Sequence, residues 1–371
     1  MQKKSQVSTQ FNWIFVLIVG GMFLLIFFTM SNRQSSAADT RISAIALAGI
    51  STIFESARTG TSLSTVVNVP DIDISFTCQS GLFGNNIYSD YRVGGLSRRI
   101  PALPTFAPGT LRGTNLITWT VSWDMPFKIM NFLFLANSRT RFFFYFPDDQ
   151  NLDFKQTINE TFSRNIYSII TDTTEDLDFY NDLYSIIVIF ADDATFNSLD
   201  KGFLSRFDND VRVIQVIPDD DFRFGNIKYR DGAANLEGES IYFGLASFYG
   251  AVFSPDKEYY ECSMKKALKR FERISCVYKQ KYQLMRQTYV SNPNCDFAYN
   301  NALQAFNNLF GDEFCVITEN TDPQTSEEFP NTIDLNSPTF SFESYIDYKN
   351  FFDDLSTQNR QTIVRSCELL Y

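Results

Sequence analysis

The sequence predicts an α/β fold in which a transmembrane helix and a stalk helix precede a β-rich segment, a small three-layer unit with a parallel sheet, and a helical C-terminal region. Three observations predict this fold. A run of twenty residues without a charge, Phe11–Met30, lies near the start of the chain. Strand-like alternation of apolar and polar residues follows it. Further on, short continuous apolar runs alternate with helical patterns, which is typical of a parallel sheet covered on both faces.

The uncharged run is long enough to cross a membrane. Twenty helical residues rise about 30 Å, which matches the hydrocarbon core of a bilayer, and Trp13 near its edge suits the interface. The alternative is a cleaved secretory signal, whose apolar core usually has about 7–15 residues. Ser35 to Ala38 would then supply the cleavage site. We predict that Phe11–Met30 stays attached as an anchor and that residues 1–10 face the cytoplasm.

The cysteines indicate on which side of the membrane the body lies. The positive residues that flank the run nearly balance, so they orient it only weakly. The six cysteines form an even, scattered set without a CxxC pair, which fits disulfides in an oxidising space; free thiols in a cytosolic domain are the alternative. We therefore predict a single-pass protein of the cell membrane with an extracytoplasmic body. The candidate disulfide cysteines are Cys78, Cys262, Cys276, Cys295, Cys315 and Cys367.

Charge and composition limit the classes of partner. The formal net charge of −11 argues against nucleic acid, which selects basic surfaces, and against a body lying on anionic lipid. With 44% apolar residues and 38 Phe, the chain can bury a large core in one large or two modest domains. The predicted parts are a cytoplasmic head (1–10), the transmembrane helix (11–30), a stalk helix (31–60) and an extracytoplasmic α/β domain (61–371), with a β-rich part (65–139), an α/β core (140–255) and a helical part (256–371).

An Ala-rich helix is predicted directly after the anchor, at 37–58. Ile42, Ile45, Gly49 and Ile53 recur there at helical spacing. If this helix continues the membrane helix, the pair spans about 70 Å. A membrane helix that runs into an Ala-rich helix and then a β-rich head resembles the pilin plan over the first 60 residues. The sequence departs from that plan, since no Gly or Ala peptidase site precedes the run and no Glu lies inside it. A plain anchor with a stalk is the alternative.

The β-rich part contains two alternating segments. Residues 66–77 and 116–123 alternate apolar and polar side chains, as half-buried strands do. The Gly- and Pro-rich stretch 79–115 predicts long loops with one short strand near 87–93. Residues 127–135 form an apolar run, for which we predict a short buried helix.

The α/β core and the helical part follow. Strands of the parallel sheet are predicted at 140–146, 185–191 and 211–217, with an added edge strand at 222–229. Helices are predicted between them at 152–166 and 195–207, and beyond them at 256–289, 295–310, 342–355 and 358–370, with a polar loop at 318–338.

Spacing in the helical part favours one disulfide, Cys262–Cys315. Cys262 and Cys276 are about 21 Å apart along one helix and cannot bond. In an antiparallel helix hairpin that turns near Pro293, Cys262 lies about 45 Å down one arm. Cys315 lies about 40 Å down the other arm, if the chain is extended after the second helix. The two cysteines are then level.

The stretch GAVFSPDKEYYECSMKKALKRF, together with the FNWIF start of the anchor, resembles a group of uncharacterised single-pass archaeal membrane proteins. The resemblance implies a membrane protein with an extracytoplasmic domain. It implies no activity and no site residues.

Catalytic motifs are scarce. The chain contains no His, which excludes the usual Cys/His zinc sites and a nucleophile activated by His. The phosphate-binding glycine motifs are also absent from the sequence. A Ser–Lys pair or carboxylate chemistry remains open, without a motif for either.

Three of the predicted strands end in consecutive aspartates, with Asp149, Asp192 and Asp219 as the first choices for a site. Because the carboxyl ends of parallel strands meet at one edge of a sheet, these carboxylates would repel unless a hard cation such as Mg²⁺ or Ca²⁺ lay between them. The alternative is helix capping, since Asp is favoured at helix N-termini.

The sequence favours a membrane-anchored surface protein without catalysis. Its body would bind a protein partner or further copies of itself, and residues 11–30 would bind the lipid bilayer. An anchored metal-dependent hydrolase or transferase that uses the strand-end aspartates is one alternative, and a pilin-like subunit is another. We expect no nucleic-acid partner and no cofactor other than Mg²⁺ or Ca²⁺ at the aspartates.

Overall fold

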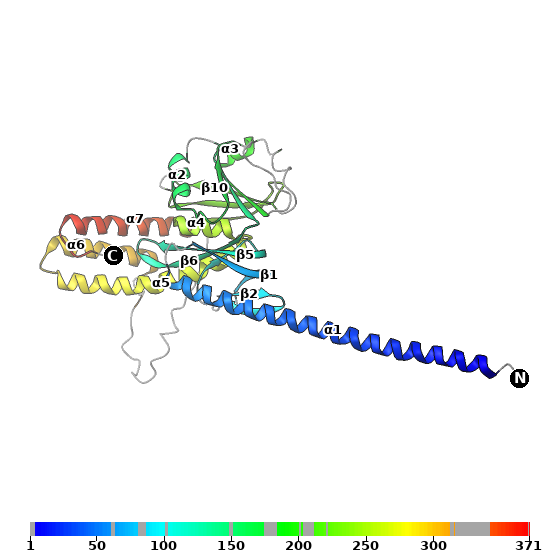
Figure 1. The fold of residues 1–371 in the computed structure, drawn as a ribbon. Coiled ribbons are helices and arrows are strands. Elements are labelled where there is room, and N and C mark those ends of the chain that lie inside the picture. Colours follow the sequence, from blue (N-terminus) through cyan, green and yellow to red (C-terminus); the bar gives the residue numbers. More distant parts are fainter. Residues whose placement is uncertain are drawn as a thin grey trace, which may run out of the picture.

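The computed structural model describes residues 4–60, 64–80, 87–100, 103–147, 151–173, 184–199, 202, 211–219, 222–311, 315, 342–369 and 371. These residues form a mixed α/β fold with two six-stranded sheets (Figure 1). The first sheet lies next to the long N-terminal helix, the second lies on the other side of helix α4, and a bundle of helices extends from one end of the first sheet.

The N-terminal helix α1 (Lys4–Thr59) is one uninterrupted element of 56 residues, about 84 Å long. It contains the predicted stalk helix at 37–58 and continues it without a break into the uncharged run. Its N-terminal half projects away from the body (Figure 1). In the part of the chain that the structure describes, no helix combines the length and the apolarity of a membrane span. The side chains of residues 11–14 lie outside that part.

The C-terminal half of α1 belongs to the core of the body. Leu47, Ile50 and Phe54 are buried in a cluster with residues of the first sheet. The hydroxyl of Tyr91 donates a hydrogen bond to the Leu47 carbonyl oxygen over 3.0 Å, and the Phe54 and Tyr91 rings are 5.1 Å apart. The C-terminal half of α1 is therefore held to the first sheet by apolar contacts as well as by the covalent connection to β1.

The first sheet is built almost entirely from antiparallel neighbours, with the parallel pair β4–β6 at one edge. The strands predicted at 66–77, 87–93 and 116–123 are confirmed within it. Its order is β3 (Leu96–Ile100), β2 (Ile87–Val93), β1 (Ser64–Ser80), β5 (Thr110–Asp124), β6 (Lys128–Asn137) and β4 (Thr105–Phe106).

Two predictions for this region are wrong. The buried helix predicted at 127–135 is strand β6, which pairs with β5 and β4. A short apolar run has the same sequence pattern in a buried strand and in a buried helix, and Phe132, Leu133 and Phe134 are buried on both faces of the sheet. The stretch 79–115 also contains more strand than predicted, since β3, β4 and the start of β5 lie in it.

The second sheet combines parallel and antiparallel strands. Strands β8, β7, β9 and β10 are parallel neighbours, and β11 and β12 continue the sheet antiparallel. The three predicted parallel strands are confirmed. The order is β12 (Leu236–Phe243), β11 (Phe224–Arg230), β10 (Val211–Pro218), β9 (Tyr184–Phe190), β7 (Thr140–Tyr145) and β8 (Ser168–Thr171). The strand predicted at 222–229 is therefore not at the edge, because β12 covers it.

Helices cover both faces of the second sheet, as predicted. Helix α2 (Leu152–Thr161) buries Phe154 and Ile158 on one face, and α3 (Asp193–Ser198) buries Phe196 on the other. Helix α2 ends before the predicted residue 166, because the chain turns at Phe162 and enters the unpredicted strand β8. The helix predicted at 195–207 is also shorter, because α3 ends at Ser198 and Leu199 is extended.

One aromatic core joins the two sheets. Helix α4 (Gly244–Phe253) lies between them (Figure 1) and is almost wholly buried. The Phe253 ring is 5.2 Å from that of Phe134 in the first sheet and 4.6 Å from that of Phe142 in the second. Such pairs add stabilisation beyond the area that they bury.

The helical part contains α5 (Lys257–Thr288), α6 (Pro293–Phe310) and α7 (Phe342–Val364), packed side by side (Figure 1). The first two confirm the predicted helices 256–289 and 295–310. Helix α7 is one helix where two were predicted, because Leu355 and Gln358, at the expected break, both face the bundle and are buried. The polar loop predicted at 318–338 lies outside the described residues.

Candidate functional site

The sequence left two interpretations open for the aspartates at the carboxyl edge of the second sheet, a metal site and helix capping. Strands β7, β9 and β10 are parallel, so their carboxyl ends share this edge. Of the three predicted ligands, Asp149 lies outside the described residues, while Asp192 follows β9 and Asp219 follows β10.

Asp192 is the N-cap of helix α3. Its Oδ1 accepts a hydrogen bond of 2.7 Å from the Thr195 backbone amide. This hydrogen bond lowers the pKa of the Asp192 carboxyl, because it stabilises the charged form. Capping, the alternative that the sequence left open, describes this residue.

Asp219 pairs with Lys349 of helix α7. Its backbone also closes the turn between β10 and β11, because its amide donates to Phe224 O over 2.9 Å and its carbonyl accepts from the Phe222 amide over 2.9 Å. Asp219 therefore connects the edge of the sheet to the helical bundle, a role that cannot be predicted from its position after a strand.

Asp193, next to Asp192, accepts three hydrogen bonds from side chains. Lys228 Nζ donates to both carboxylate oxygens, over 2.8 Å and 2.7 Å, and Gln215 Nε2 donates over 3.0 Å. The hydrogen bond from Lys228 lowers the pKa of Asp193. Burial lowers the pKa of Lys228, but its contacts with Asp193 and Glu239 outweigh this effect and the net shift is upward.

A second cation completes this network. Gln215 is fully buried, and its Oε1 accepts hydrogen bonds from Arg230 Nε and Nη2 over 3.0 Å and 2.7 Å. The Arg230 guanidinium also lies over the Phe196 ring, 4.2 Å from its centre. Lys228 and Arg230 alternate along β11, a pattern that marks one polar face of a strand. Among the described carboxylates of this edge, Asp193 is thus paired with a cation of the protein itself.

Over the residues with described side chains, no group of three or more Asp, Glu, Cys or His is placed to hold a metal ion. Asp192 caps α3, and Asp219 pairs with Lys349. A site that includes Asp149 stays a prediction.

Disulfides are confirmed, but the predicted pair Cys262–Cys315 is wrong. All six candidate cysteines are bonded, and the pairs are Cys78–Cys262, Cys276–Cys315 and Cys295–Cys367. The prediction treated α5 as one arm of a hairpin. In the structure its first half packs on β1 and β2 of the first sheet, which brings Cys262 to Cys78.

The predicted position of Cys315 assumed an extended chain after α6. Instead Gly311, directly after that helix, has a φ of 87°, and Cys315 itself has a φ of 69°. A positive φ bends the chain away from an extended path. The disulfide with Cys276 places Cys315 about 21 Å along α5 from Cys262.

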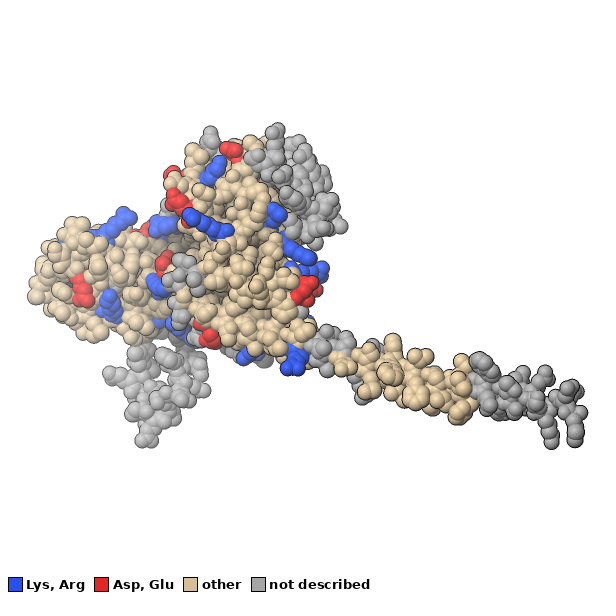
Figure 2. Space-filling view, viewed as in Figure 1, with Lys and Arg blue, Asp and Glu red and all other residues tan. Residues whose placement is uncertain are grey.

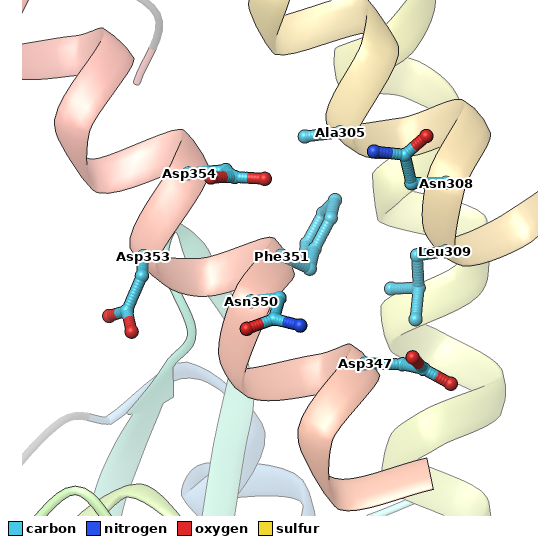
Figure 3. A pocket seen from close by; sticks show the side chains of 8 residues that line it. All are labelled: Ala305, Asn308, Leu309, Asp347, Asn350, Phe351, Asp353 and Asp354. Atoms are coloured by element: carbon cyan, nitrogen blue, oxygen red, sulfur yellow. The ribbon is translucent and has the colours of Figure 1, made fainter.

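A hollow of about 260 Å³ lies between α6 and α7 (Figure 3). Three carboxylates, those of Asp347, Asp353 and Asp354, contribute to its walls. Asp353 is paired with Arg223 over 3.1 Å, and burial and the charge of Asp353 raise the pKa of Asp354. The remaining lining residues are Ala305, Asn308, Leu309, Asn350 and Phe351. This lining indicates no particular ligand.

Among the residues that the structure describes, Lys266 and Ser89 form a Ser–Lys pair. Lys266 of α5 donates a hydrogen bond to the Ser89 hydroxyl of β2, and burial lowers the pKa of Lys266 to about 8. A serine nucleophile activated by a neutral lysine needs these two features. Ser89, however, has 0% exposed surface, so a substrate cannot reach its oxygen in this conformation. The pair serves packing here.

Comparison with protein-family models, with curated proteins and with solved structures found no match. The resemblance to single-pass archaeal membrane proteins therefore stays a prediction.

Proposed function

We propose that the protein is a membrane-anchored surface protein. Residues 11–30 cross the bilayer, residues 1–10 face the cytoplasm, and the α/β body lies outside the membrane as a module for binding or assembly without catalysis. One observation carries the proposal. Between Phe15 and Met30, twelve large apolar side chains of the projecting half of α1 are each 54% to 73% exposed. Figure 2 shows no charged residue along this described stretch.

The distribution of these side chains favours lipid over a protein partner. They lie all around the helix, and a helix that is apolar on every side is buried in a core or in a membrane. Covering them is favourable by about 25 cal/mol per Å² of apolar surface. A partner on one side would leave the other side in water, whereas hydrocarbon covers every side.

Two properties of the body support an extracytoplasmic location. The body contains three disulfides, and disulfides persist in oxidising compartments and are rare in the cytosol. The net charge of −11 favours a body that stands away from an anionic lipid surface.

A pilin-like subunit is the second candidate, favoured by one specific observation. Helix α1 is continuous, with one half free and the other half packed on a largely antiparallel sheet. This arrangement extends the resemblance beyond the anchor and stalk. The missing peptidase site and the missing Glu in the run count against it.

An anchored metal-dependent hydrolase or transferase has less support. Asp192 caps a helix and Asp219 pairs with Lys349, so two of the three proposed ligands have other roles.

The anchor is tested by carbonate extraction of membranes that carry the full chain. We expect the protein to stay in the membrane pellet with an intact mass that includes residues 1–30. Replacing Leu24 by Arg costs about 3–4 kcal/mol on insertion and should move protein to the supernatant. Val277→Arg is the matched control, because Val277 is also exposed but lies on α5 of the body.

Two results would contradict the anchor. One is full-length wild-type protein in the carbonate supernatant, and the other is a mature chain that begins near Ala37 or Asp39. Electron microscopy separates the pilin-like alternative, which requires filaments and removal of the first residues.

A further inference from the structure

A short sequence motif lies in the last turn of helix α2. Asn159, Glu160 and Thr161 form an Asn-X-Thr triplet, which is the acceptor sequence for N-linked glycosylation. No other Asn in the sequence is followed by Ser or Thr two positions later. The chain therefore offers a single acceptor of this kind.

The Asn159 side chain is free to carry a large group. It is exposed, and it makes no hydrogen bond with any residue that the structure describes. Asn165, by contrast, donates to the carbonyl oxygen and the hydroxyl of Ser64 over 3.2 Å and 2.9 Å. Asn159 also lies about 100° around the helix from Ile158, which is buried against the second sheet. A glycan on Asn159 therefore displaces no contact of the described fold.

The Thr161 hydroxyl, in contrast, is fixed in the folded protein. It donates to the Thr157 carbonyl oxygen over 2.7 Å and lies 2.5 Å from the hydroxyl of Tyr249 on α4. Ser and Thr share this hydroxyl, so the acceptor sequence depends on it. A transferase can reach it only before α2 packs against Tyr249. The modification is thus expected on the emerging chain, before the body folds.

The proposed location of the body meets the other requirement. Asn-X-Thr acceptors are used in secreted and surface proteins, and the proposed function puts the body outside the membrane. Helix α2 lies beside the second sheet, and the first sheet lies between that part of the body and α1 (Figure 1). The membrane helix therefore does not cover this surface.

We propose that Asn159 carries an N-linked glycan in the mature protein. The proposal rests on the proposed function, because it needs the body outside the membrane. In the transfer, Asn159 Nδ2 forms a bond to the anomeric carbon of a lipid-phosphate-linked oligosaccharide, and the bond from that carbon to the phosphate oxygen breaks. The amide nitrogen gives up one proton, and the lipid phosphate leaves as the anion. The bulky, hydrophilic glycan then keeps this surface of α2 out of contacts with a partner.

The intact mass of the full chain, extracted from its native membranes, tests the proposal. We expect a mass above that of the polypeptide and, after proteolysis, a glycopeptide that contains Asn159. Asn159→Gln should return the chain to the polypeptide mass, whereas Thr161→Ser keeps the hydroxyl and should stay modified. Asn308→Gln is the matched control and should keep the added mass, because Asn308 is also exposed on a helix but is followed by Leu309 and Phe310.

Two results would overturn the glycan and leave the anchor standing. One is a chain of polypeptide mass that stays in the carbonate-washed pellet with its disulfides formed, and the other is an added mass that persists in Asn159→Gln. Free thiols at all six cysteines would instead overturn the extracytoplasmic location, and the glycan with it. A chain glycosylated at Asn159 in the carbonate supernatant would uphold the glycan and overturn the anchor.

Discussion

Lys266 donates a hydrogen bond to the fully buried hydroxyl of Ser89. Ser89 lies directly opposite Cys78 in the β1–β2 ladder, and Cys78 is bonded to Cys262, one turn before Lys266 on α5. A disulfide and a lysine–serine hydrogen bond thus fasten the same turn of α5 to the same two strands.

The low pKa of Lys266 should appear in the stability of the protein at alkaline pH. Burial lowers this pKa from its ordinary 10.5 to about 8. Between these values the unfolded chain binds more protons than the folded one, so the free energy of unfolding should rise with pH. Denaturant melts from pH 8 to 10 measure it. Lys266→Met should flatten the rise, whereas Lys265→Met, on the neighbouring residue, should keep it; a flat wild-type profile would contradict the prediction.

Glu272 should have the opposite effect near neutral pH, where it should make the free energy of unfolding fall as pH rises. It is 6% exposed in the helical bundle, and burial raises its pKa to about 7, although Lys269 and Arg273 oppose the shift. Between its ordinary 4.5 and 7 the folded chain binds the extra proton. Stability from this group is therefore complete below pH 4.5 and falls, by up to about 3 kcal/mol, as pH rises through 7.

Replacing Glu272 by Gln removes the titrating group. We expect the variant to lose this decline in thermal stability between pH 5 and 8, and to be more stable than the wild type at pH 8. Glu258→Gln, at an exposed position on the same helix, is the control and should keep the decline. The same pH profile in wild type and Glu272→Gln would show that the carboxyl is not responsible.

Two of the disulfides should contribute differently to the free energy of unfolding. The bridge Cys78–Cys262 closes 184 residues and Cys276–Cys315 closes 39. Removing a bridge from a secreted domain costs about 2–5 kcal/mol, and a longer loop costs more. Replacing both cysteines of the long bridge by Ala should therefore destabilise the body about 1 kcal/mol more than the same change in the short one. Urea unfolding of the two double variants measures this difference, and the reverse order would contradict it.

Divalent cations should leave the thermal stability of the body unchanged. Asp192 caps α3, and Asp193 and Asp219 are paired with lysines, so each of these carboxylates already has a partner within the chain. We expect the same Tm in millimolar Mg²⁺, in Ca²⁺ and with a chelator, for the wild type and for Asp192→Asn. A rise in Tm with either ion that Asp192→Asn abolishes would establish the metal site instead.

Local patterns predicted most elements of the fold, because the physics that produces them is local. Runs such as Phe142–Phe144 are apolar on both sides of a strand, and only a covered sheet buries both sides. Strand β6 was mistaken for a helix, because a short, continuous apolar run has no periodicity that distinguishes a buried strand from a buried helix.

Partners distant in the sequence could not be predicted in this way. The bond from Cys262 to Cys78 depends on how α5 crosses the first sheet, which no spacing within the helical part contains. The pairing of Asp219 with Lys349 likewise depends on where α7 docks. Asp192 was closer to prediction, because a cap depends only on the residues of its own helix.

The continuity of α1 has a mechanical consequence. The helix enters the core at Leu47 and Phe54 with no break between its buried and its projecting halves. The helix therefore has no hinge about which the body can rotate independently of the projecting half. A tilt imposed on the far end is transmitted as a tilt of the head, so the orientation of the whole body is set by a single rigid lever.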